Sequence, residues 1–159
     1  MPKQPTHDTV AAGLVALLDN QTARMHAALE DLAQEAYDAE QANGCNSIRA
    51  IGAHMIMLCR FQLVILESEL AASIPDDHAA HTPDQLRELL AASMGQVRAA
   101  IIDHDASDWL AVPEPAREGN WGDEPTLARL ARPFNDLINH IGAIRAIRRL
   151  MGVPNNRTQ

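Results

Sequence analysis

Aromatic residues are scarce in this sequence, and the shortage narrows the class of fold. They make up 3% of the 159 residues, whereas hydrophobic residues as a whole make up 47%. The core must therefore be built from aliphatic side chains, methionine and alanine. Such a composition favours packed helices over a β-sandwich, which is rich in β-branched and aromatic residues. The length corresponds to about one domain with a sizeable core.

Basic residues are also few, which argues against nucleic acid as a partner. The sequence has 13 Lys and Arg residues against 21 Asp and Glu residues, a formal net charge of −8. A nucleic-acid-binding protein normally carries a basic face, because neutralising phosphates drives its affinity. The one basic cluster, Arg145, Arg148 and Arg149, falls in the last turns of a predicted helix, where it can interact favourably with that helix's dipole.

Cysteine is limited to Cys45 and Cys59, which lack C-x-x-C spacing and give no disulfide framework. We therefore expect reduced thiols in a cytoplasmic protein. The first residues lack the apolar run of a signal peptide. The most apolar stretch, residues 48–66, is interrupted by charged and polar side chains, which argues against a membrane span.

Apolar residues recur at helical spacing in four segments. The second segment is apolar almost all round, so we expect it to pack against neighbours on more than one side. Four helices with short or medium connections predict an all-α protein, an antiparallel four-helix bundle. We expect this single domain to cover residues 1–152 and a flexible tail to cover residues 153–159. The segments run from about Asp8 to the mid-thirties, from Asn46 or Ser47 to about Ala72, from Thr82 to about Ile102, and from about Thr126 to Met151.

Turn and cap residues mark the boundaries of these segments. Thr82, Pro83 and Gln85 form a strong start signal, with a capping threonine, proline at the first helical position and a capping-box glutamine. Residues 103–124 form a long loop that contains Trp109 and Trp121. These tryptophans either line a substrate pocket or anchor the loop onto the end of the bundle.

Two histidines are predicted to point into the bundle. His54 has apolar residues at positions −3, +4 and +7 of the second helix, and His140 has apolar neighbours on the fourth helix. Asp136 lies four residues before His140, about 40° round the helix and about 6 Å along it, so the two side chains can converge.

A divalent cation would satisfy these three groups together. A buried carboxylate or imidazole without a partner is costly. Two neutral imidazoles and one carboxylate can bind a divalent ion and leave positions open for water or substrate. The alternative is that the histidines are hydrogen-bonded core residues, and that Asp136 faces solvent or pairs with Arg129 or Arg132.

Two short stretches resemble the DinB-like (YfiT-like) superfamily. They are Asn-Ser-Ile at residues 46–48, which leads into the helix with His54, and Asp-Leu-Ile-Asn-His-Ile-Gly at residues 136–142, which runs on to Arg-Arg-Leu-Met-Gly at residues 148–152. The resemblance implies a four-helix bundle with one metal-binding histidine on the second helix and a His-x-x-x-His pair on the fourth. His54 and His140 match this pattern, whereas Asp136 stands where the family usually has histidine. A carboxylate there lowers the net charge of the site by one and should make the ion a weaker Lewis acid.

The resemblance also implies a function. Known DinB-like proteins include thiol-dependent S-transferases and isomerases, which use low-molecular-weight thiols such as mycothiol or bacillithiol, and presumed hydrolases. We therefore expect a metal-dependent transferase or hydrolase that activates a thiol or water for a small-molecule substrate, with zinc, nickel, manganese or iron as the metal. A homodimer is expected as well. The alternative is a non-catalytic helical bundle with a degenerate site, acting as a binding or interaction protein.

The remaining histidines and cysteines are weaker candidates. His26 lies near the edge of the first apolar stripe, either as a boundary residue or as a substitute third ligand. His104 falls near a helix C-terminus, where the helix dipole favours its protonated form. Cys59 lies about 140° from His54 around the helix and does not share its face. His78 and His81 fall in a connection, and Cys45 precedes the second helix without an activating base.

Overall fold

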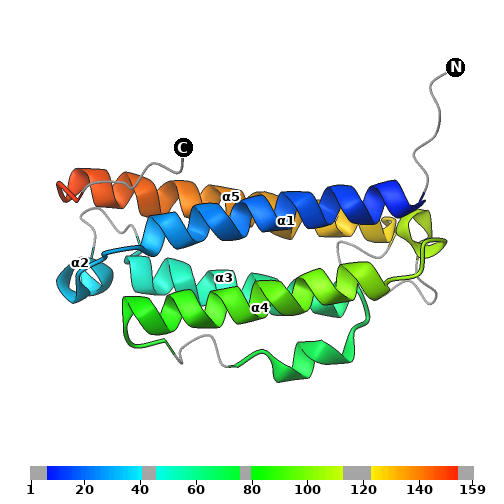
Figure 1. Cartoon of the computed structure of the whole chain (residues 1–159), viewed down its shortest axis with the longest axis horizontal. Helices are drawn as coiled ribbons and strands as arrows, with labels where there is room; N and C mark the ends of the chain where they lie inside the picture. Colours follow the sequence, from blue (N-terminus) through cyan, green and yellow to red (C-terminus); the bar gives the residue numbers. More distant parts are fainter. Residues whose placement is uncertain (1–6, 41–45, 76–79, 113–122, 154–159) are drawn as a thin grey trace, which may run out of the picture.

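The computed structural model describes residues 7–40, 46–75, 80–112 and 123–153. Within these ranges every regular element is helical, so the prediction of an all-α bundle is confirmed (Figure 1). The predicted tail falls mostly on residues 154–159, outside the described ranges. The elements in chain order are α1 (His7–Leu29), α2 (Gln34–Asp38), α3 (Ile48–Ile65), the 3-10 turn η2 (Glu69–Ser73), α4 (Pro83–Asp103), the 3-10 turn η4 (Asp108–Leu110) and α5 (Thr126–Leu150).

The long helices do not simply alternate in direction. Figure 1 shows α1 and α5 running one way, and α3 and α4 running the other way. Close contacts agree, because Gly52 near the start of α3 lies against Leu86 near the start of α4, and Arg148 near the end of α5 bonds to Ala28 near the end of α1. The strictly antiparallel order expected from the sequence is therefore wrong for two neighbouring pairs. Residues 66–82 are long enough to run back along the roughly 27 Å of α3, which lets α4 start beside the start of α3.

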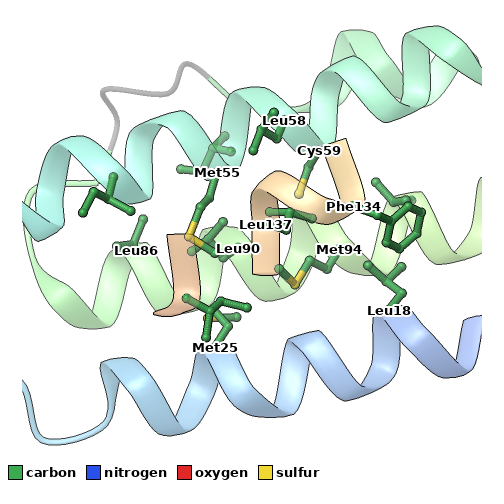
Figure 2. Close-up of a cluster of buried hydrophobic side chains, with 14 of the residues drawn as sticks. Leu18, Met25, Met55, Leu58, Cys59, Leu86, Leu90, Met94, Phe134 and Leu137 are labelled. Atoms are coloured by element: carbon green, nitrogen blue, oxygen red, sulfur yellow. The ribbon is translucent and has the colours of Figure 1, made fainter. Parts of the chain in front are cut away.

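The core lies between the four long helices and is aliphatic, as the composition predicts. Figure 2 shows side chains from all four helices pointing toward one another. Burial of such side chains stabilises the bundle by about 1.5–3 kcal/mol each. The labelled core residues include Leu18, Met25, Met55, Cys59, Leu90, Met94, Phe134 and Leu137.

Two predicted helix starts are confirmed by their caps. The Ser47 hydroxyl accepts a hydrogen bond from the Ala50 backbone N–H at the start of α3. At the start of α4, Thr82 accepts from the Gln85 backbone N–H, and the Gln85 side chain accepts from the Thr82 backbone N–H. Both caps satisfy backbone donors that the first helical turn leaves without partners.

Two predicted helix ends were placed too late. The first helix ends at Leu29 rather than in the mid-thirties, and α3 ends at Ile65 rather than near Ala72. Shortly after each end a non-glycine residue adopts a left-handed backbone, Asp31 with φ 52° and Glu67 with φ 54°. This conformation cannot continue a right-handed helix.

Among the described helices, α3 has the length and mean hydropathy of a membrane span, but 61% of it is buried inside the bundle. Its neighbours in the bundle therefore account for most of its apolar character. This matches the expectation of a helix that packs on more than one side.

Candidate metal centre

His54 on α3 and His140 on α5 lie side by side. Their ring centroids are 4.8 Å apart and the ring planes meet at 84°. The two histidines are 86 positions apart in the sequence, and they meet because α3 and α5 pack against each other in opposite directions (Figure 1). The structure therefore brings together two of the three predicted ligands.

The pair lies at the surface rather than in the core. His54 is exposed and His140 is half-buried, so the prediction that the His54 imidazole points inward is wrong. The core face of α3 is formed by residues such as Met55 and Cys59. Because α3 is apolar almost all round, the apolar neighbours of His54 did not identify which side faces the core. The surface position leaves both rings accessible to solutes.

Both burial and nearby charges change the pKa of His140. Burial lowers its pKa most, the neighbouring His54 lowers it further, and the Asp136 carboxylate raises it. The balance keeps the pKa of His140 below its ordinary value, which favours the neutral ring, whose nitrogen lone pair can act as a ligand.

The separation of the rings can be compared with metal coordination. A histidine nitrogen lies about 2.0–2.1 Å from a zinc ion, which places the centroids of two imidazoles on one ion on the order of 5 Å apart. The separation of 4.8 Å between His54 and His140 agrees with this spacing. The centroid separation of the pair is thus compatible with two ligands of one divalent ion.

The third predicted ligand is not assembled with the pair. Asp136 is half-buried and acts on His140 through its charge. Across the described ranges, no group of three or more His, Cys, Asp or Glu side chains is arranged to hold a metal ion. Arg132 instead forms an ion pair with Glu124 at 2.7 Å, and nothing in the described part of the chain pairs Asp136 with Arg129 or Arg132. Asp136 as a ligand stays a prediction.

A comparison with known protein families decides the family. The family model of the DinB superfamily matches residues 17–144, which include both histidines and Asp136. The chain belongs to the DinB superfamily. No curated protein matches it.

Other polar candidates in this DinB-superfamily chain lie apart from the histidine pair. His26 lines a shallow surface pocket on α1 with Glu30 and Arg87, and His81 is exposed before α4. Cys59 is fully buried, and burial raises the pKa of its thiol to about 12, so it is not a nucleophile at neutral pH. Cys45, His78 and Trp121 lie outside the described residues.

The position of Trp109 supports the interpretation that this residue anchors the loop onto the end of the bundle. Its side chain is buried in η4, and its ring packs against the His104 ring with centroids 4.4 Å apart. Burial lowers the pKa of His104, although the charges of Asp108, Asp105 and Glu67 raise it. The expectation that the helix dipole favours a protonated His104 is therefore wrong, because burial outweighs the favourable charges.

Exposed apolar residues on α3 were not predicted from the sequence. Phe61 and Val64 lie on the second helix, which was expected to pack against neighbours on more than one side, yet both are exposed, and so is Met57. The signal was present in the sequence, since a helix that is apolar all round exposes apolar side chains wherever a neighbouring helix is missing.

Proposed function

We propose that this DinB-superfamily protein binds a divalent metal ion through His54 and His140, with Asp136 as the third ligand, and that it is a metal-dependent enzyme. The observation that carries the proposal is the contact between the two imidazoles, with ring centroids 4.8 Å apart. The reaction would be a thiol-dependent transfer or a hydrolysis of a small-molecule substrate.

The protein's own side chains have the properties that such a site needs. The lowered pKa of His140 favours its neutral ring, and the exposed His54 ring leaves room for a substrate. Asp136 lies one helical turn before His140 and would lower the net charge of the site. When bound, the ion would supply Lewis-acid activation of a thiol or a water molecule.

The metal would be zinc, nickel, manganese or iron, since imidazole and carboxylate ligands suit all four. A low-molecular-weight thiol such as mycothiol or bacillithiol would be the cosubstrate of a transfer reaction. We place the protein in the cytoplasm, where a buried free thiol such as Cys59 stays reduced.

We further propose a homodimer that forms through α1 and α5. These helices border an apolar groove of about 430 Å³, and exposed apolar grooves of this kind often mark contact surfaces. Among the described residues that line it, Asn135 is the only polar one. Its lining includes Leu14, Leu17, Leu127, Phe134 and Ile138.

A non-catalytic bundle is the second candidate. It is favoured by one observation, that the described ranges contain no assembled group of three metal ligands. In that case the histidine pair would be a degenerate site, and the protein would act by binding a partner.

Elemental analysis separates the two candidates. Protein purified without a metal-affinity tag should contain close to one equivalent of metal per chain, and His54→Ala or His140→Ala should each remove most of it. His26→Ala is the matched control, because His26 is a half-buried histidine on α1 away from the pair. Less than about a tenth of an equivalent in the unmodified protein would contradict the metal site.

Activity assays then address the reaction class. Metal-loaded protein should be assayed with a panel of thiol cofactors and electrophilic substrates, with the His54→Ala variant as the blank. Turnover that depends on both the metal and a thiol would support a transferase, and turnover with water alone would support a hydrolase. Full metal occupancy without turnover in either assay would favour the binding protein.

A further inference from the structure

Three large apolar side chains lie exposed on the face of α3 that carries His54. Met57 is 42% exposed, Phe61 is 36% exposed and Val64 is 38% exposed. They follow His54 by three, seven and ten positions, so all lie within about 80° of it around the helix. Together they form an apolar strip, here named the α3 stripe, that runs about 15 Å along the helix away from His54.

The α3 stripe ends at the histidine pair. His54 lies on the same face of α3, and the His140 ring contacts His54 from α5. A molecule whose polar group reached the two imidazoles could therefore place the rest of its body along the stripe. Apolar contact with the stripe is the more favourable choice for an apolar body.

The surface area of the α3 stripe indicates whether a protein or a small molecule could bind to it. From the exposed fractions, the three side chains offer on the order of 200 Å² of surface, against about 800 Å² that each partner contributes to a standard protein–protein interface. The stripe is too small to hold a second protein by itself, but an alkyl chain or an aromatic ring would cover much of it.

We propose that the α3 stripe binds the apolar part of a substrate whose polar group is held at His54 and His140. The inference rests on the metal site proposed above. It narrows the substrate class to amphiphilic molecules, with a metal-binding polar end and an aliphatic or aromatic body up to about 15 Å long.

Alkyl hydroxamates test the inference, because they bind divalent metals through the polar end and vary only in the chain. The zinc-loaded full chain is titrated calorimetrically with acetohydroxamate, hexanohydroxamate and octanohydroxamate. We expect the affinity to rise about two- to fourfold for each added methylene group, since a stripe covers one side of the chain. The ε-methyl resonance of Met57 should shift with the octyl compound and not with the acetyl compound.

A double variant, Met57→Ser with Val64→Ser, should flatten this dependence on chain length. Its zinc content and its affinity for acetohydroxamate should stay unchanged, because neither residue is a proposed ligand. Ile102→Ser is the matched control, since Ile102 is 54% exposed on α4 and away from the pair, and this variant should keep the full dependence.

Three other outcomes would contradict the inference, and they can be told apart. If the protein holds zinc but binds all three hydroxamates equally, the α3 stripe is not a substrate site and the proposed metal function still stands. If the protein takes up no zinc, the proposed function and this inference fail together. If the double variant changes the sedimentation coefficient from that of a dimer to that of a monomer, the stripe is a subunit interface.

Discussion

The environment of His104 at the end of α4 combines a buried ring with nearby carboxylates. Its imidazole packs against Trp109, and its Nε2 atom is buried without a hydrogen-bond partner in the described part of the chain. Burial disfavours the charged ring more than Asp108, Asp105 and Glu67 favour it, so the pKa is lowered. The folded protein therefore prefers a neutral His104.

This preference predicts a dependence of stability on pH. Because the pKa of His104 is lower in the folded chain than its ordinary value of about 6.5, the unfolded chain binds more protons between the two values. The contribution of His104 to the free energy of unfolding is thus fully present above pH 6.5 and is lost as the pH falls through the folded pKa. Urea unfolding of the unmodified protein and of His104→Gln, at pH 7.5 and pH 5, should show a smaller loss in the variant. An equal loss in both proteins would contradict this account.

Gln62 is a second residue whose burial has a measurable cost. Its side chain is fully buried on α3, and neither amide atom has a hydrogen-bond partner among the described residues. Because an unsatisfied buried polar group costs about 1–3 kcal/mol, Gln62→Met should raise the free energy of unfolding by a similar amount. Urea unfolding measures the change. A loss of stability would mean that the amide has a partner, such as a buried water molecule.

At the residue scale, spacing predicted which side chains could meet but not which way a helix faces. The DinB-like pattern selected His54 and His140, and their rings are in contact. The prediction that His54 points inward was wrong, because α3 is apolar almost all round and its pattern does not single out the core face. The distance from Asp136 to the pair depends on how α3 and α5 pack, and spacing along one helix does not determine that.

Among the helices, the C-terminal ends of α5 and α1 are joined by hydrogen bonds from one arginine. The buried Arg148 guanidinium donates hydrogen bonds to the backbone carbonyl oxygens of Ala28 and Glu30. The sequence predicted that this arginine interacts with the dipole of its own helix. In the structure its guanidinium instead binds backbone carbonyls at the C-terminal end of α1. A positive charge is favourable there too, because the dipole of α1 places partial negative charge at that end.

Arg148→Met should therefore destabilise the bundle by roughly 3 kcal/mol, because two hydrogen bonds from a charged donor are lost and the buried carbonyl of Ala28 is left without this partner. Thermal or urea unfolding checks this value. Arg149→Met is the matched control, since Arg149 is exposed on the next position, and it should change stability by no more than about 0.5 kcal/mol. Equal effects of the two substitutions would show that Arg148 does not link α5 to α1.

The starts of the long helices were predictable, and so were the ends of α4 and α5, but the ends of α1 and α3 were not. Thr82 and Gln85 satisfy each other's backbone donors through a local pattern of four residues, which can be read directly from the sequence. The ends of α1 and α3 depend on the left-handed residues Asp31 and Glu67. Neither residue is glycine or asparagine, so the sequence carries no strong local stop signal at these positions.

For the molecule as a whole, the sequence predicted the fold class but not the direction of every helix. Four amphipathic or apolar segments of this length can only bury their apolar faces against one another. The close approach of Gly52 to Leu86 places the start of α4 beside the start of α3, so these two helices, joined by the connection of residues 66–82, run parallel. A connection of this length permits either direction, so the sequence could not choose between them.

The proposed dimer gives a test at this scale. If the α1/α5 groove is the subunit interface, Leu17→Glu should convert the protein from a dimer to a monomer, because Leu17 is an exposed residue of that groove. Sedimentation velocity at a fixed concentration measures the change. Ile102→Glu on α4 is the control and should leave the dimer intact. An unmodified protein that is monomeric at high concentration would contradict the proposal.

Nitrogen NMR of the imidazole rings during a zinc titration shows whether His54 and His140 share one divalent ion. We expect the ring nitrogens of both histidines to shift together and to stop shifting at one equivalent of zinc per chain. Rings that do not shift, or that respond separately and only to excess zinc, would contradict it.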